Sequence, residues 1–265
     1  RVVTKAKRVY IAGDDDQAIY RWAGARPEFL MNMDGTRTIL NKSYRLAESI
    51  HAKANKLIKR VKDRVDKEWT ARDEKGQVNI HPVEQLQKMK QGEWLILARD
   101  GYRLDKLEEE LKIYGYFYER GDKTSINKRV HEAILAWEDV RKGKELDIKR
   151  VKSFYNYIKT GTGVDKKFKG MKNVDKDKMF TFDMLKESYG LKIGKDLPWF
   201  KALENIESTK KTYVRMCLRR KENIRRAPRI KLSTIHGSKG GEADNVMLLT
   251  DLTRKADASY WSQRD

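Results

Sequence analysis

The side chains best suited to chemistry near the start of the chain are those of Gln17, Tyr20 and Trp22, within the run from Val9 to Ala25. The amide of Gln17 both donates and accepts hydrogen bonds, so it can contact a phosphate oxygen and a water molecule at once. The rings of Tyr20 and Trp22 offer flat faces on which unpaired bases stack, an interaction worth roughly 1–3 kcal/mol per base. One loop could therefore touch nucleotide and nucleic acid together. A polar turn followed by aromatic core residues is the alternative that composition leaves open.

A strand is needed to position this loop. Residues 8–12 form a short apolar run bounded by turn residues, which predicts a buried strand with polar groups at its carboxyl end. Ligands bind at that end of the strands in open α/β sheets. Three aspartates, Asp14, Asp15 and Asp16, follow directly, and they could serve as metal ligands or form a structural turn.

The run GDDDQAIYRWAGA resembles the third helicase motif of the UvrD/Rep/PcrA-type superfamily-one DNA helicases. The resemblance implies that Gln17 contacts the γ-phosphate of ATP and that Tyr20 and Trp22 stack on single-stranded DNA. It also favours a structural turn, and no metal site, for the three aspartates. The family often has arginine after the tryptophan, where this chain has Ala23.

The segment Asn-Lys-Ser-Tyr-Arg, residues 41–45, resembles the fourth motif of the same helicases. In that family the tyrosine stacks on adenine and the arginine reaches the γ-phosphate from the second lobe, which implies these roles for Tyr44 and Arg45. A planar, permanently charged guanidinium suits the second role because it can neutralise a phosphoryl group in its transition state. The apolar spacing after it predicts an amphipathic helix over Leu46–Val65.

Residues 94–118 have the order strand, helix, strand that is typical of a parallel sheet. Trp94–Arg99 is a buried apolar run, Leu104–Ile113 has helical spacing, and a second apolar run follows at residues 115–118. The block resembles the second-lobe segment, motif IVa, of these helicases. Arg99 ends its strand where DNA would pass, so the sequence leaves open a phosphate contact and a structural salt bridge.

A second candidate site lies near the end of the chain, between strands predicted at residues 229–235 and 245–250. The loop between them resembles the fifth motif, Thr-x-His-x-x-Lys-Gly-x-Glu, at Thr234, His236, Lys239, Gly240 and Glu242. The resemblance implies that the threonine, histidine and lysine contact nucleic acid, and that the glycine and glutamate lie against ATP. Small residues let backbone N–H groups approach phosphate, and a carboxylate accepts hydrogen bonds from ribose hydroxyls.

Helical patterns dominate between residues 121 and 228, and the stretch is rich enough in aromatic residues for a small core of its own. Helices are predicted at Val130–Arg141, Val151–Lys159, Phe182–Tyr189, Pro198–Ile206 and Thr209–Arg225. We interpret this stretch as an all-helical insertion. The cations near its last helix could contact duplex or single-stranded DNA, or form a solvated helix face.

The predicted fold is α/β, a RecA-like parallel-sheet lobe interrupted by the helical insertion. We expect residues 1–37 to end the first RecA-like lobe, 38–120 and 229–265 to form the second, and 121–228 to be the insertion. No Gly-x-x-x-x-Gly-Lys-Ser/Thr phosphate loop occurs in the sequence, and the Walker B and sixth motifs are also absent. The full-length protein would use ATP with Mg²⁺, and we expect neither to bind tightly to this chain alone.

The formal charge of +20 favours nucleic acid as a partner, because a basic surface releases counterions when it binds a polyanion. A solvated, lysine-rich surface is the alternative. No apolar run approaches the roughly 20 residues of a bilayer span, and no signal peptide is evident. We therefore expect no membrane partner and a cytoplasmic location in a bacterial or phage-infected cell. The single Cys217 excludes an internal disulfide.

The resemblance implies part of an ATP-dependent helicase that moves 3′ to 5′ on single-stranded or partly duplex DNA, in DNA repair or replication. The chain would supply the second-lobe half of the ATP cleft and part of the DNA track, with a missing N-terminal helicase lobe as its partner. The alternative is a non-catalytic nucleic-acid-binding module with the fold of a helicase lobe.

Overall fold

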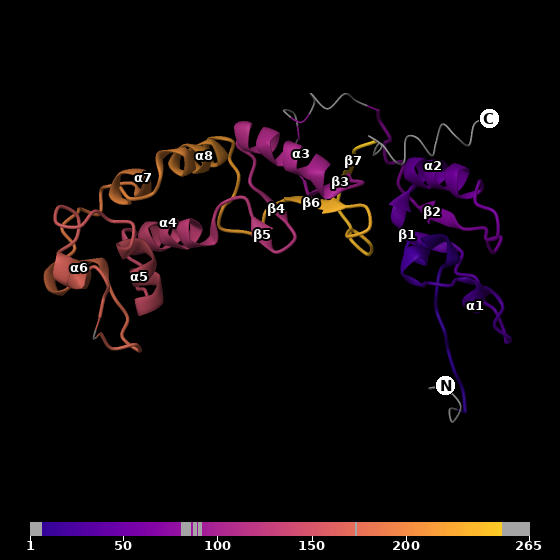
Figure 1. The fold of residues 1–265 in the computed structure, drawn as a ribbon, viewed down its shortest axis with the longest axis horizontal. Helices are drawn as coiled ribbons and strands as arrows, with labels where there is room; N and C mark the ends of the chain where they lie inside the picture. The colour runs from indigo at the N-terminus through magenta and orange to yellow at the C-terminus, as the bar shows by residue number, and fades with distance from the viewer. Residues whose placement is uncertain (1–6, 81–85, 87–88, 90–91, 173, 251–265) are drawn as a thin grey trace. The chain divides into compact units, whose positions relative to one another are not determined.

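The computed structural model describes residues 7–80, 86, 89, 92–172 and 174–250, apart from the side chain of Trp22. The chain divides into two compact units, residues 1–85 (the first unit) and 86–265 (the second unit), which Figure 1 draws in indigo to violet and in magenta to yellow. Each unit combines helices with a sheet that contains parallel strands, in agreement with the predicted α/β class. Residues 251–265, part of the predicted return segment, lie outside the described residues.

The first unit is built around a β-α-β arrangement. Strands β1 (Lys42–Ala47) and β2 (Thr70–Arg72) pair in parallel, and helix α2 (Glu48–Ile58) connects them. Before β1 lie the short helix α1 (Glu28–Met31) and two 3-10 turns, η1 (Asp15–Gln17) and η2 (Arg21–Ala23). The backbone N–H of Glu48 donates to the carbonyl of Glu74 at 2.8 Å, so the chain that follows β2 returns to the start of α2.

Two predictions for the first unit are wrong. Residues 8–12 do not form a buried strand, and the side chain of Tyr10 is 88% exposed. An apolar segment forms a strand only where a second strand can pair with it through backbone hydrogen bonds. No strand in the described part of the chain pairs with residues 8–12. The helix predicted to reach Val65 ends at Ile58. Beyond it, the N–H of Val65 donates to Asp15 Oδ2 at 2.7 Å, a tertiary bond that a continued helix would forfeit.

The second unit contains a five-stranded sheet in the order β5-β4-β6-β3-β7. Its strands are β3 (Trp94–Ala98), β4 (Tyr118–Arg120), β5 (Lys123–Thr124), β6 (Ile230–Thr234) and β7 (Asn245–Leu248). Only β4 and β5 pair antiparallel. Helix α3 (Gly101–Ile113) buries Leu104, Leu107 and Leu111 in a core shared with β3, β4 and β6, as its spacing predicts.

Strand β7 is less buried than its apolar sequence predicts. Val246 is 58% exposed and Leu248 is 52% exposed. Within the described strands β7 pairs with β3 alone and forms the edge of the sheet, so one of its sides lacks the cover that an internal strand receives.

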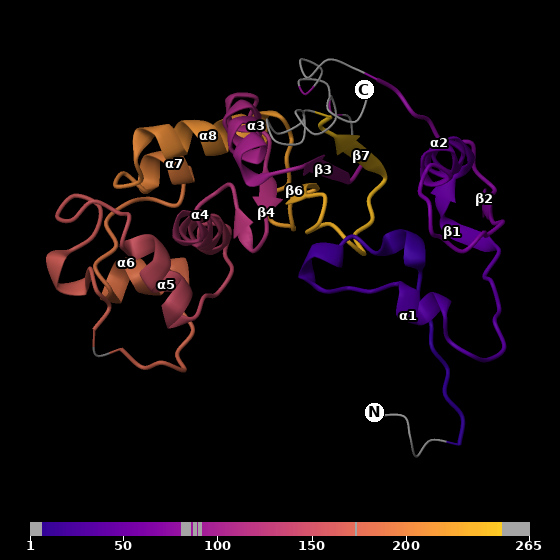
Figure 2. The ribbon, with the colours of Figure 1, turned by 45° about the vertical axis from the view of Figure 1, so that its right-hand side comes forward.

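The helices of residues 128–219 form a second core. They are α4 (Lys128–Val140), α5 (Ile148–Tyr155), α6 (Phe182–Ser188), α7 (Trp199–Ala202) and α8 (Ser208–Arg219), with a 3-10 turn η4 (Lys166–Phe168). Helices α4 to α8 each overlap a predicted helix, whereas no helix was predicted at η4. Aromatic residues such as Trp137, Phe154 and Phe180 fill the core. Figure 2 shows these helices beyond β4 and β5, on the side of the sheet away from β7. The Tyr213 hydroxyl donates to the Tyr116 carbonyl at 2.6 Å and so joins α8 to the chain before β4.

Candidate nucleic-acid interface

Two neighbouring strands of the second unit end level with each other. Strands β3 and β6 pair in parallel from Trp94 and Ile230 to Ala98 and Thr234, and the N–H of Ile235 donates to the Ala98 carbonyl at 2.9 Å. Arg99 and His236 therefore leave the same edge of the sheet from adjacent strands. Helix α3 also begins at this edge, with its first N–H groups near Asp100, whose carboxylate accepts from the N–H of Arg103 at 3.0 Å.

Arg99 is exposed directly after β3. The sequence left open a structural salt bridge or a contact to phosphate. Over the residues that the structure describes, the guanidinium of Arg99 has neither an ion-pair partner nor a hydrogen-bond acceptor. The salt-bridge alternative therefore has no support among these residues, and the guanidinium is available to an anion.

The loop after β6 is folded by bonds of its own backbone and hydroxyl groups. Thr234 Oγ1 accepts from the N–H of Gly237 at 3.1 Å, and the Thr234 carbonyl accepts from the N–H of Ser238 at 3.0 Å. The Ser238 carbonyl in turn accepts from the N–H of Gly241 at 2.8 Å. Gly240 has φ +85°, a left-handed conformation that favours glycine. These bonds fix a compact turn that begins at the last residue of β6.

The predicted site residues of this loop share one exposed stretch. Thr234 is half-buried at the strand end, whereas His236, Lys239, Gly240 and Glu242 are exposed. The second unit thus brings Arg99 and all five residues of the fifth-motif pattern to the loops that follow β3 and β6.

In the first unit, the three aspartates are held by cations from a distant part of the chain. Lys67 Nζ lies 2.8 Å from Asp14 Oδ1 and 3.0 Å from Asp16 Oδ2, and it also contacts Asp15. Arg64 forms two hydrogen bonds of 2.9 Å to Asp16. The carboxylate oxygens lie within 4.8 Å of one another, a spacing that would suit a metal ion. The ammonium of Lys67 lies among them, and together with Arg64 it offsets two of their three negative charges, which fits the structural-turn interpretation.

Electrostatics around this turn follow from the same contacts. Hydrogen bonding from Arg64 lowers the pKa of Asp16 against the opposing effect of burial. Burial would raise the pKa of Asp15, but hydrogen bonds from Lys67 and from the N–H of Val65 outweigh it and leave that pKa lowered. Burial likewise opposes the charge of Lys67, yet the three carboxylates raise its pKa overall. The side chains of Asp15, Asp16, Arg64 and Lys67 are therefore all charged at neutral pH. The sequence carries no local signal for Arg64 or Lys67 as partners of this turn.

Gln17 and Tyr20 lie on the turns that follow the aspartates. Gln17 Nε2 donates to Asp14 Oδ2 at 2.7 Å, which orients the amide. Tyr20 is half-buried, and its carbonyl accepts from the N–H groups of Ala23 and Ala25 at 2.9 and 3.2 Å. The stacking prediction for Trp22 concerns a side chain outside the described residues.

Tyr44 and Arg45 lie inside strand β1. Tyr44 is 83% exposed, with the Lys42 ammonium 6.0 Å from its ring centroid. Arg45 is exposed, and its N–H donates to Ser43 Oγ at 3.3 Å. Both residues are held in an extended conformation because β1 pairs with β2 from Lys42 onward.

Residues 1–38 match the model of the UvrD/REP helicase N-terminal domain. The chain is similar to DNA helicase II of Salmonella typhimurium, 44% identical over 69 residues, which are 24% of the chain and 10% of that protein. It is also similar to DNA helicase II of Haemophilus influenzae, 40% identical over 76 residues (27% and 10%), and of Escherichia coli, 44% identical over 69 residues (24% and 10%). The match therefore spans a tenth of each relative's length. No solved structure matches the chain.

A search of the described residues finds no helix long and apolar enough to cross a membrane.

Proposed function

We propose that the chain is part of an ATP-dependent DNA helicase of the UvrD type that moves 3′ to 5′ on single-stranded DNA. The observation that carries this proposal is the similarity to DNA helicase II of three bacteria, together with the family match over residues 1–38. In this proposal residues 1–37 end the first RecA-like lobe. Residues 38–120 and 229–265 belong to the second lobe, and residues 121–228 are its helical insertion.

The insertion is supported by the path of the chain through the sheet of the second unit. The chain leaves the sheet after β4 and β5, passes through α4–α8, and returns as β6. Strand β6 then pairs in parallel with β4, with Tyr118 opposite Ile230. A stretch that leaves and re-enters a sheet at neighbouring strands can carry a core of its own without interrupting the pairing.

We assign the DNA track to Arg99, Thr234, His236 and Lys239 in the second unit, and to Tyr20 and Trp22 in the first. Backbone phosphates are bound mainly by arginine, lysine and hydroxyl side chains and by backbone N–H groups, and the loops after β3 and β6 offer all of these. Aromatic rings add stacking that tolerates any base sequence. Alternating grip on the strand would then be coupled to ATP hydrolysis in the full-length protein.

Each unit also carries residues that we assign to ATP: Gln17, Tyr44 and Arg45 in the first, and Gly240 and Glu242 in the second. Arg45 would place a permanent positive charge against the phosphates. We assign no Mg²⁺ ligand to this chain, because the three clustered carboxylates are already paired with Lys67 and Arg64. We therefore expect no ATP hydrolysis by the 265-residue chain, and DNA-stimulated hydrolysis by the purified chain would contradict this.

The proposal is tested by measuring the affinity of the purified chain for labelled single-stranded DNA. We expect weak, salt-sensitive binding that Trp22→Ala weakens by about tenfold, the loss of one stacked base. Phe29→Ala is the matched control, because Phe29 on α1 is an aromatic side chain of the same unit and is 68% exposed. Absence of binding at low salt would contradict the proposal, and equal affinity after Trp22→Ala would remove the stacking role.

A further inference from the structure

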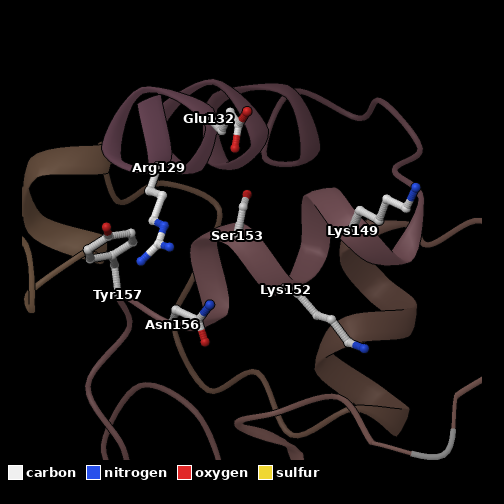
Figure 3. A pocket seen from close by; sticks show the side chains of 7 residues that line it. All are labelled: Arg129, Glu132, Lys149, Lys152, Ser153, Asn156 and Tyr157. Carbon is white, nitrogen blue, oxygen red and sulfur yellow. The ribbon is translucent and has the colours of Figure 1, made fainter. Parts of the chain in front are cut away.

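A hollow of about 440 Å³ lies between α4 and α5, away from every residue assigned above. Arg129 and Glu132 line it from α4, and Lys149, Lys152, Ser153, Asn156 and Tyr157 line it from α5 and the residues after this helix. Figure 3 shows Arg129 reaching from α4 toward Tyr157 and Asn156, with the Ser153 hydroxyl directed into the space between the helices. The Lys149 and Lys152 side chains extend from α5 at the other end of the hollow.

The hollow is formed by the outer face of α5. Its residues follow one another at i, i+3, i+4 and i+7, from Lys149 to Asn156, which places them along one side of the helix. The opposite side, with Val151, Phe154 and Tyr155, is buried in the core. The fold therefore requires apolar residues on the inner face of α5, whereas packing in the core does not determine which residues occupy the outer face.

The charges around the hollow differ from two cations that lie close to them in the sequence. Arg150 on α5 pairs with Asp139 at 2.5 Å, and Arg141, directly after α4, pairs with Glu138 at 2.7 Å. The three cations of the hollow, Arg129, Lys149 and Lys152, form no ion pair with any residue in the described ranges. Glu132 is the one carboxylate in the lining. Three positive charges against one negative charge attract an anion.

The hydrogen-bond donors that line the hollow suit a phosphate ligand better than a carboxylate ligand. The guanidinium of Arg129 offers a planar fork that fits phosphate oxygens, and Asn156 and Tyr157 add an amide and a hydroxyl donor beside it. The two lysines, one helical turn apart, supply further charge for a second phosphate. We propose that the hollow between α4 and α5 is a binding site for an anion with linked phosphates, either a nucleic-acid backbone or a free polyphosphate. This site goes beyond the proposed function, since none of its residues belongs to the helicase-like motifs.

The test follows the backbone amide NMR signals of Ser153 and Asn156 while the full chain is titrated with tripolyphosphate and, separately, with short duplex DNA. We expect saturable shifts of both signals with at least one of the two anions. The double variant Arg129→Gln/Lys149→Gln should weaken that binding by about tenfold, since it removes two charge-assisted contacts. Shifts with tripolyphosphate alone would assign the site to a free polyphosphate, and shifts with duplex DNA would assign it to a nucleic-acid backbone. Both results support the site.

The control is Lys186→Gln/Lys201→Gln, which removes the same two charges from exposed positions on α6 and α7 outside the hollow. It should change the affinity by less than about twofold, because remote surface charges are screened by salt. Equal weakening by both double variants would overturn the proposal in favour of general charge attraction. Absence of shifts at Ser153 and Asn156 with both anions would also overturn it. Neither result would affect the single-strand test at Trp22, which lies in the first unit.

Discussion

The N–H of Ile235 donates to the carbonyl of Ala98 at 2.9 Å, and this bond makes β3 and β6 end together. One residue further along each strand, Arg99 and His236 emerge at a common edge although 137 positions separate their numbers in the sequence. Thr234 and Lys239, the other residues of the proposed DNA track in the second unit, lie on either side of His236 in one compact turn. The sheet therefore brings the loops after β3 and β6 to a common edge.

Replacing Thr234 by valine removes the hydroxyl that accepts from the N–H of Gly237 at 3.1 Å, while a β-branched side chain remains at the end of β6. We expect hydrogen exchange of the Gly237 amide to accelerate about fivefold, since such a bond contributes about 1 kcal/mol. Binding of single-stranded DNA should weaken as the turn loosens. Thr212→Val on the exposed side of α8 is the control. Unchanged exchange at Gly237 would show that the hydroxyl does not hold the turn.

Asp139 is the centre of the charge cluster that fastens α4 to its surroundings. Its buried carboxylate pairs with Arg150 at 2.5 Å, Arg225 at 2.9 Å and Lys144 at 3.2 Å. We expect Asp139→Asn to lower the free energy of unfolding of the second unit by about 2–3 kcal/mol. This is less than for a fully buried pair, because the cations are partly exposed. Urea unfolding followed by near-UV circular dichroism measures the change. The exposed Asp122→Asn should leave it within about 0.5 kcal/mol, and an equal loss in both variants would contradict the role of the cluster.

Lys67 contacts all three carboxylates of the aspartate turn in the first unit. Lys67→Met keeps much of the side chain's apolar length but leaves the carboxylates of Asp14, Asp15 and Asp16 with Arg64 alone. We expect a local loss of about 2–4 kcal/mol, because the Asp15 side chain is only 6% exposed and would lose its main counter-charge. This loss of local stability is measured as faster hydrogen exchange of the Val65 amide, which donates to Asp15. Lys62→Met at an exposed position is the control, and normal protection of Val65 in Lys67→Met would contradict the prediction.

Acid should weaken the fold through the same carboxylates. Hydrogen bonds from Arg64, Lys67, Arg150 and neighbouring donors hold the pKa values of Asp16, Asp15 and Asp139 below their ordinary value, against the opposing effect of burial. A carboxyl whose pKa is lowered by folding stabilises the fold above its unfolded value of about 3.9, and the contribution disappears as the pH falls through the folded value. Unfolding free energies measured in urea should therefore be level near neutral pH and decrease below about pH 4. A stability that remains level to about pH 2 would contradict these ion pairs, and Asp139→Asn should flatten the decrease.

Periodicity in the sequence was sufficient to predict most of the second unit. The apolar run at Trp94–Arg99, the helical spacing of Leu104, Leu107 and Leu111, and the strand predicted at residues 229–235 each correspond to an observed element. These patterns are local, and the apolar positions that they mark in β3, α3 and β6 are buried, so local hydrophobicity and final burial agree. Strand β7 departs from this agreement because its place at the edge depends on sheet order, which the apolar run does not encode.

The first unit was harder to predict because its structure depends on partners far apart in the sequence. The turn at Asp14–Asp16 is held by Arg64 and Lys67, about fifty positions later. Arg64 and Val65, the last residues of the predicted helix, contact this turn and are not helical. Residues 8–12 have strand-like composition but no hydrogen-bonding neighbour among the described strands. The motif resemblance selected the candidate site residues, and only the structure related Arg99 to the loop at His236.

The most direct test of the DNA track is the salt dependence of single-stranded DNA binding by Arg99→Ala. If Arg99 contacts a phosphate, the variant should bind more weakly, and the slope of log affinity against log salt should become shallower by about 0.7. Lys112→Ala, which removes one charge from the exposed last turn of α3, should keep the wild-type slope. A slope for Arg99→Ala that equals those of the wild type and of Lys112→Ala would contradict the assignment of the sheet edge to DNA.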